Sequence, residues 1–123
     1  MSTILIVEDN EKNMKLVRDV LRHHGYATLE AITGGEGFRL AVEERPDLIL
    51  MDIALPGMDG LTLTRQLKAD TTTRHIVVVA LTAFAMKGDD LKAREAGCDG
   101  YITKPIDTRS LPDAVAGYLR SRS

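Results

Sequence analysis

The chain has 123 residues, and its 16 Lys and Arg against 18 Asp and Glu give a formal net charge of −2. This length indicates one domain, and 44% hydrophobic with 28% charged residues is typical of a globular fold and excludes a disordered chain. The near-neutral charge, without a run of Lys or Arg, argues against a nucleic-acid or anionic-membrane partner.

Short apolar runs alternate with amphipathic segments along the whole chain, without a linker, a leader or a membrane-spanning run, so we expect a cytoplasmic protein. The runs predict strands at Thr3 to Val7, Ala27 to Ala31, Leu48 to Met51, Ile76 to Leu81 and Tyr101 to Thr103. The first, third and fourth runs are continuous in Ile, Val and Leu, which is typical of central strands covered on both faces. The second and fifth runs are weaker, so we expect them nearer the edges of the sheet.

Helical periods lie between the runs. Their apolar positions are Met14, Val17 and Leu21, then Phe38, Ala41 and Val42, then Leu63 and Leu67, and last Leu111, Ala114, Val115, Tyr118 and Leu119. A fourth helix, about Gly88 to Ala96, offers only Leu91, Ala93 and Ala96 for packing, so we expect it to be the loosest element. Thr33 with Glu36 indicates a capping box, and Gly25 and Gly97 stand where helix ends need a left-handed residue.

Strand and helix alternate five times, which predicts an α/β fold: a doubly wound parallel sheet of five strands with five helices on its two faces. Ligands bind such sheets beyond the carboxyl ends of the strands. Polar residues follow four of the expected strands, and they are Glu8, Asp9, Asp52, Thr82 and Lys104.

Three carboxylates brought to one edge repel one another unless a cation neutralises them. Because only oxygen donors are present, a hard ion such as Mg²⁺ fits better than zinc and leaves positions for phosphate oxygens. Each residue also has an ordinary structural explanation. Asp9 could cap a helix and Asp52 could sit in a turn, while the Thr82 hydroxyl could bond the backbone. The joint placement favours a functional site.

The residues of this edge belong to segments that resemble the receiver domains of two-component response regulators. These segments are LIVEDN (5–10), PDLILMD (46–52), LPGMDG (55–60), ALTA (80–83) and KP (104–105). Within the family, the segments NMKL (13–16) and TAFAMKGD (82–89) resemble the single-domain DivK-type cell-division regulators. The resemblance implies the flavodoxin-like strand order 2-1-3-4-5.

By this resemblance Asp52 is the phosphoacceptor for a phosphohistidine on a histidine kinase or a histidine phosphotransfer protein. Mg²⁺, or Mn²⁺ in its place, would be held by Glu8, Asp9, Asp52 and the backbone carbonyl of Ala54. The residues implied to bind phosphate or to switch on phosphorylation are Thr82, Ala83, Lys104 and Tyr101. The bond before Pro105 is expected to be cis, and the fourth helix, fifth strand and fifth helix would form the face that a downstream protein reads.

Two residues are expected to set how long the phosphoryl group stays. Ala54 and Phe84 lie two positions beyond Asp52 and Thr82, and by the same resemblance these positions would flank the attacking water. Neither side chain can hydrogen-bond a water, so we expect slow self-dephosphorylation. The chain departs from the commoner Asp-Asp pattern at Glu8-Asp9, which leaves open whether Glu8 reaches the metal directly or through water.

The expected protein is therefore a single receiver over residues 1–123, with no effector domain and no enzymatic turnover. A receiver excised from a hybrid histidine kinase is an alternative. A Mg²⁺-dependent phosphatase with an aspartate nucleophile is a weaker alternative, because Ala54 stands where that class has its general acid. A flavin module is disfavoured because Glu8 and Asp9 would repel a phosphate. Cys98 is alone and is expected to pack without a redox role.

Overall fold

The computed structural model describes residues 2–55, 59–83 and 89–121. Over these residues, strands and helices alternate in the order β1 (Thr3–Val7), α1 (Glu11–His23), β2 (Ala27–Ala31), α2 (Gly34–Glu44), β3 (Leu48–Asp52), α3 (Gly60–Ala69), β4 (Val77–Thr82), α4 (Asp89–Ala96), β5 (Gly100–Thr103) and α5 (Leu111–Ser121). The strands form one parallel sheet in the order β2-β1-β3-β4-β5, which confirms the expected fold. None of the described helices has the length and apolar character needed to cross a bilayer.

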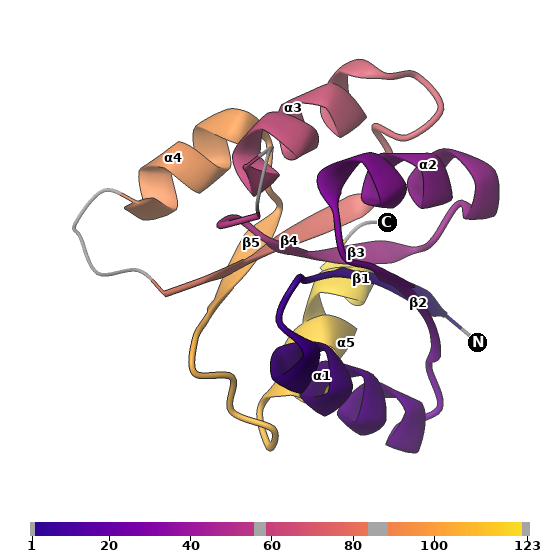
Figure 1. The fold of residues 1–123 in the computed structure, drawn as a ribbon, viewed down its shortest axis with the longest axis vertical. Coiled ribbons are helices and arrows are strands. Elements are labelled where there is room, and N and C mark those ends of the chain that lie inside the picture. The colour runs from indigo at the N-terminus through magenta and orange to yellow at the C-terminus, as the bar shows by residue number, and fades with distance from the viewer. Residues whose placement is uncertain (1, 56–58, 84–88, 122–123) are drawn as a thin grey trace.

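Helices cover both faces of the sheet: α1 and α5 lie on one face, and α2, α3 and α4 lie on the other (Figure 1). Successive strand residues point to opposite faces, so the sheet feeds two cores. Ile4, Ile6, Leu48, Leu50 and Leu81 pack toward α1 and α5. Leu5, Val7, Ile49, Met51 and Val78 pack toward the other helices. Every residue of β3 and β4 is buried, as expected for central strands.

The helix ends follow the sequence signals with two differences. Asn10, and not Asp9, caps α1 by accepting a hydrogen bond from the Asn13 amide at 3.1 Å. Thr33 caps α2 as expected, but the Glu36 carboxylate accepts from the Ile32 amide at 3.3 Å and not from the cap residue itself. Gly25 and Gly97 have φ values of 89° and 101°, which confirms the left-handed positions. Asp9 is therefore left available for another role.

The fourth helix packs through fewer residues than the sequence indicated. Ala93 and Ala96 are buried, with exposed fractions of 1% and 3%, but Leu91 is 56% exposed. The expectation that Leu91 belongs to the packing face is wrong. A helix of eight residues makes about two turns, so its periodicity fixes the buried face poorly.

A lysine of α3 donates hydrogen bonds to groups at the edge of the sheet where β4 and β5 begin. The Lys68 ammonium, at the end of α3, lies 2.9 Å from Asp99 Oδ2 and also donates to the carbonyls of Arg74 and Ile76, at 3.3 and 2.7 Å. The same Asp99 oxygen accepts from the Val78 amide at 2.8 Å. We call this group the amino-edge latch, defined by Lys68, Asp99 and the two carbonyls. It ties α3 to the starts of β4 and β5.

Side chains of α1 reach across to the exposed edge strand β2. Arg18 donates to Glu30 at 3.1 Å, and Arg22 donates to the Thr28 hydroxyl at 2.9 Å. Both strand residues lie within the stretch of β2 that pairs with β1 alone. The outer strand is thus flanked by polar and charged groups of α1.

Candidate functional site at the carboxyl edge of the sheet

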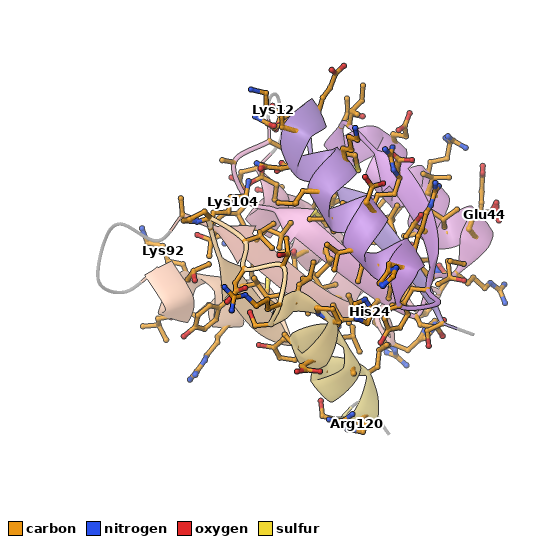
Figure 2. All side chains as sticks on the ribbon, turned by 90° about the horizontal axis from the view of Figure 1, so that it is seen from below. Lys12, His24, Glu44, Lys92, Lys104 and Arg120 are labelled. Atoms are coloured by element: carbon orange, nitrogen blue, oxygen red, sulfur yellow. The ribbon has the colours of Figure 1, made fainter. Side chains whose placement is uncertain are left out.

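Alternation along three strands delivers Glu8, Asp52 and Lys104 to the same face. Each lies two residues beyond an apolar residue that packs toward α1 and α5, namely Ile6, Leu50 and Ile102. Because side chains alternate along a strand, all three charged groups leave the sheet on that face at its carboxyl edge. Figure 2, seen from that face, shows Lys104 closer to Lys12, in the first turn of α1, than to His24 and Arg120.

The backbone around Asp52 is fixed by a close approach of α3. Gly60, the first residue of α3, donates its amide to the Ile53 carbonyl at 3.0 Å. A Cβ at Gly60 would overlap the Asp52 carbonyl oxygen and would lie 2.7 Å from the Ile53 Cα, so glycine is required for this approach. The Ala54 amide then donates to Asp52 Oδ1 at 2.9 Å and orients the carboxylate.

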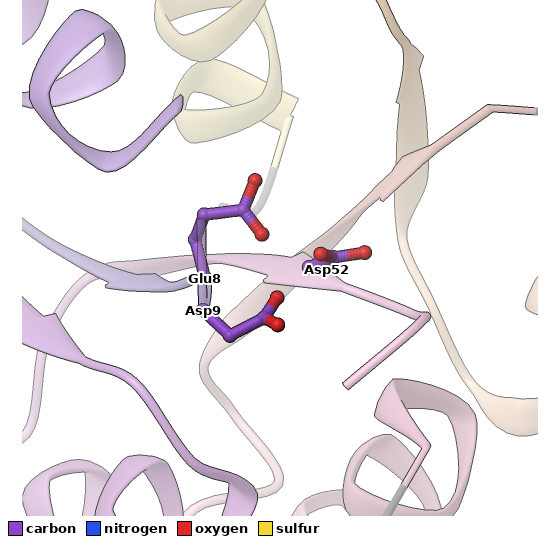
Figure 3. Close-up of side chains that lie close together, drawn as sticks. All are labelled: Glu8, Asp9 and Asp52. Carbon is purple, nitrogen blue, oxygen red and sulfur yellow. The ribbon is translucent and has the colours of Figure 1, made fainter. Parts of the chain in front are cut away.

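Three carboxylates converge at this edge. One oxygen each of Glu8, Asp9 and Asp52 lies within 4.8 Å of the others (Figure 3). Glu8 is fully buried and Asp52 is 5% exposed, whereas Asp9 is open to solvent. The site is therefore shielded from solvent at Glu8 and Asp52 and open to solvent at Asp9.

Lys104 partly neutralises the two buried acids. Its ammonium lies 2.9 Å from Glu8 Oε1 and 3.2 Å from Asp52 Oδ2. The Lys104 amide donates to the Thr82 carbonyl at 2.7 Å, which fixes the backbone just past β5. The Lys104–Pro105 bond is cis, as expected.

The surroundings shift the pKa values of Glu8 and Asp52 in opposite directions. Burial, together with the neighbouring Asp52, raises the pKa of Glu8 to about 7, although Lys104 acts in the opposite direction. Burial alone would raise the pKa of Asp52, but Glu8, the Ala54 amide and Lys104 outweigh it and hold that pKa below its usual value. Burial would lower the pKa of Lys104, but the two carboxylates raise it overall. Asp52 is thus the more acidic of the two buried carboxyls.

The donor set fits a hard divalent cation. Glu8 Oε2 is buried, and within the described ranges no group reaches it with hydrogen-bond geometry. An unpartnered buried carboxylate oxygen is costly, and two further carboxylates stand beside it. Oxygen ligands of this kind suit Mg²⁺ and Mn²⁺. The cluster could therefore hold a metal ion through Glu8, Asp9 and Asp52.

The expected switch residues lie near the end of β4. Thr82 is the last residue of β4 and is 3% exposed, while Ala83 beyond it is exposed. Tyr101 is paired in register with Ala80, two residues before Thr82. Tyr101 and Thr82 are thus diagonal neighbours on the face of the sheet toward α4. Phe84, the second residue expected to tune dephosphorylation, lies outside the described residues.

Sequence reasoning missed two contacts that orient Asp52. It considered the carbonyl of Ala54 but not its amide, which bonds the carboxylate. It also did not assign a role to Gly60, although Asp59-Gly60 at a helix start is a visible signal for a cap followed by a close approach. The contact of the Ala54 amide depends on the backbone path just past β3, which the sequence pattern does not reveal.

Comparisons with known proteins place this geometry in a family. Residues 4–116 match the model for the response regulator receiver domain. Among curated relatives, the polar-differentiation response regulator DivK of Brucella anthropi is 51% identical over 117 residues, covering 95% of each chain. DivK of Brucella abortus is 50% identical over the same share.

Solved structures agree in fold. A putative response regulator from Chloroflexus aurantiacus has a TM-score of 0.92 at 30% identity and covers 97% of this chain and 98% of its own. The receiver domain of a sensor histidine kinase from Pseudomonas aeruginosa, with a magnesium ion coordinated in its active site cleft, has a TM-score of 0.88 at 34% identity over the same shares.

Proposed function

The chain belongs to the response regulator receiver domain family, and we propose that it is a DivK-type regulator whose Asp52 carries the phosphoryl group. The observation that supports this role is the pair of buried carboxylates, Glu8 and Asp52, with the partly buried Lys104 between them and Asp9 beside them. The identity to the two Brucella regulators, 51% and 50%, against 34% to a histidine-kinase receiver, favours the DivK-type role over that of a hybrid-kinase receiver.

In the proposed reaction, a carboxylate oxygen of Asp52 attacks the phosphorus of a phosphohistidine on a kinase or phosphotransfer protein. The new O–P bond makes an acyl phosphate, and the P–N bond breaks as the imidazole leaves. The depressed pKa of Asp52 keeps its carboxylate ionised for the attack. The Ala54 amide fixes one carboxylate oxygen, so the other is presented to the donor. Positioning of this kind accounts for most of what a protein contributes to phosphoryl transfer.

Glu8, Asp9, Asp52 and the Ala54 carbonyl are the groups we assign to Mg²⁺. When bound, the ion would neutralise charge on the phosphoryl oxygens and the carboxylates. Glu8 contributes a buried oxygen that the fold leaves without a hydrogen bond, and Asp9 contributes from the solvent side. The longer arm of Glu8 allows either direct or water-mediated contact.

Lys104 and Thr82 are proposed to hold the phosphorylated state. Lys104 already lies 3.2 Å from Asp52 Oδ2, so its ammonium can pair with a phosphoryl oxygen attached there. Thr82 would donate its hydroxyl to another oxygen, with Ala83 contributing backbone beside it. Tyr101 would turn inward as Thr82 moves, because the two are diagonal neighbours on one face.

The proposed output is a phosphorylation-dependent protein contact on the face formed by α4, β5 and α5, in a cytoplasmic pathway of cell-cycle or polarity control. The Brucella relatives are named as polar-differentiation response regulators. Such a partner must bind the two states with different affinity, because otherwise phosphorylation shifts no population. Leu91 and Tyr101 on this face are 56% and 37% exposed. Apolar groups in that position suit a protein partner.

The assignment of Asp52 is tested by intact mass after incubation with a small phosphodonor and Mg²⁺. The wild type should gain one phosphoryl group, and Asp52→Asn should gain none because an amide is not a nucleophile here. Asp113→Asn, an exposed carboxylate on α5, is the matched control and should be labelled like the wild type. Equal labelling of Asp52→Asn and wild type would reject the acceptor.

The proposed slow loss of the phosphoryl group is tested separately. Ala54 is exposed beside Asp52 and has no side-chain donor or acceptor for a water. Ala54→Asn should therefore shorten the lifetime of the phosphorylated protein, measured by mass after removal of the phosphodonor. An unchanged decay rate would contradict the role of Ala54, whatever the result for Asp52.

A further inference from the structure

Tyr118 of α5 packs against the edge strand β5 on the face of the sheet that α5 covers. Gly100 and Ile102 face α5, since alternation along β5 places them opposite to Tyr101 and Thr103. The ring of Tyr118 occupies the space in front of Gly100. A Cβ at Gly100 would overlap the Cε1, Cζ and Oη atoms of that ring, so only glycine leaves room for it.

The same phenol also contacts the next residue of the strand. The Tyr118 hydroxyl donates to the backbone carbonyl of Tyr101 at 3.3 Å. Tyr118 is partly buried against the core beneath α5, so its ring is anchored on the helix side. One side chain of α5 therefore contacts the backbone of two consecutive residues in the edge strand.

Tyr118 contacts β5 at Tyr101, which is the expected switch residue. Tyr101 projects from the opposite face of β5, toward α4 and diagonal to Thr82. A cleft of about 150 Å³ is lined by Tyr101, Tyr118, Gly100 and Arg94, among others. The cleft lies beside both tyrosine rings and the backbone of β5.

We propose that Tyr118 is a positioning residue that couples the switch to α5. Its ring against Gly100 and its hydroxyl on the Tyr101 carbonyl make the backbone of β5 and the helix move together. A displacement of Tyr101 on one face of the sheet is then passed through the strand to the helix on the other face. The inference rests on the proposed function, because it is phosphorylation of Asp52 that would displace Tyr101.

The alternative is that Tyr118 only fills space in the core. Tyr118→Phe separates the two, because it keeps the ring and removes the hydroxyl donor. Backbone amide resonances of residues 111–121 and the Tyr101 ring resonance would be recorded before and after phosphorylation with a small phosphodonor and Mg²⁺. In the wild type, both sets should shift.

In Tyr118→Phe, the phosphoryl adduct and the Tyr101 shift should persist, but the α5 shifts should fall at least twofold. Tyr26→Phe, a half-buried tyrosine packed on the same core away from β5, is the matched control and should behave like the wild type. Equal α5 shifts in wild type and Tyr118→Phe overturn the inference alone. A wild type that takes up no phosphoryl group overturns the proposed function and the inference with it.

The ring contact is tested by a double-mutant cycle with Gly100→Ala and Tyr118→Ala. Ala at position 100 should lower the free energy of unfolding strongly when Tyr118 is present and at least twofold less when residue 118 is Ala. The second background keeps the test valid if Gly100→Ala alone fails to fold. An equal cost of Gly100→Ala in both backgrounds would show that the phenol does not restrict position 100, and would overturn the inference.

Discussion

Each edge of the sheet holds a lysine 2.9 Å from a carboxylate, but the surroundings of the two pairs differ. In the amino-edge latch, the Lys68 ammonium has three acceptors, and the Asp99 oxygen accepts a backbone amide as well. At the carboxyl edge, Lys104 bridges two buried acids while Glu8 Oε2 lacks a hydrogen bond within the described ranges. A saturated set of polar groups stabilises the fold, whereas an unsaturated one can take a ligand.

Of the two lysine variants, Lys104→Met should give the larger effect on phosphoryl uptake. It removes a charge-assisted contact to the phosphoryl oxygens, and such contacts contribute about 1.5–3 kcal/mol, so phosphoryl uptake should slow by about tenfold to a hundredfold. The rate is measured by mass against time with a small phosphodonor. In the presence of Mg²⁺ the melting temperature should fall less than in Lys68→Met. An unchanged rate would remove Lys104 from the site.

Lys68→Met should give the reverse pattern. It leaves two carbonyls and Asp99 without their shared donor, so the free energy of unfolding should fall by about 2 kcal/mol, as for lost hydrogen bonds to a charged group. Denaturant titration measures this loss. Phosphoryl uptake at a temperature where the variant is folded should match the wild type. If uptake fell as much as in Lys104→Met, the two edges would not be separate in function.

The pH dependence of stability should give the smallest effect, and only without metal. The folded pKa of Glu8, about 7, lies above the ordinary value of 4.5, so the folded state binds more protons than the unfolded state between these values. Stability should therefore fall as the pH rises through this window. Asp52, whose pKa is lowered, affects stability only at pH values below this window. Melting curves with a chelator should show the fall in wild type and a flatter profile in Glu8→Gln.

Addition of Mg²⁺ extends the same experiment. A ligand that binds only the folded state stabilises it in proportion to the logarithm of its concentration over its Kd. Mg²⁺ should therefore raise the melting temperature most at high pH, where Glu8 is ionised. A metal-independent profile would contradict the assignment of Glu8 to the cation.

The apolar runs predicted where the five strands of the sheet lie, and three of these runs are continuous in Ile, Val and Leu. β1 and β2 have the expected bounds, whereas β3 extends one residue further, to Asp52. The expected end at Met51 follows the apolar run, but ladder pairing of Asp52 with Leu81 depends on backbone groups and continues past it. The convergence of Glu8, Asp9 and Asp52 was predictable from the strand ends alone.

Contacts between distant side chains were not predictable in this way. Lys68 and Asp99 are 31 residues apart, and a long flexible side chain can reach many partners, so nothing local pairs them. The contact between Gly100 and Tyr118 depends on how α5 is rotated over the sheet, which its apolar face fixes only approximately. Leu91 was misplaced for the same reason.

The side chains of α1 that lie over the edge strand β2 are expected to limit aggregation of the protein at high concentration. A strand at the margin of a sheet offers unpaired backbone groups to any other extended segment, which is the first step of fibril formation. Arg18 on Glu30 and Arg22 on Thr28 keep charge and bulk beside that margin. Replacing both arginines with alanine should therefore increase aggregation of the concentrated protein, visible as light scattering, before it alters the chemistry at Asp52.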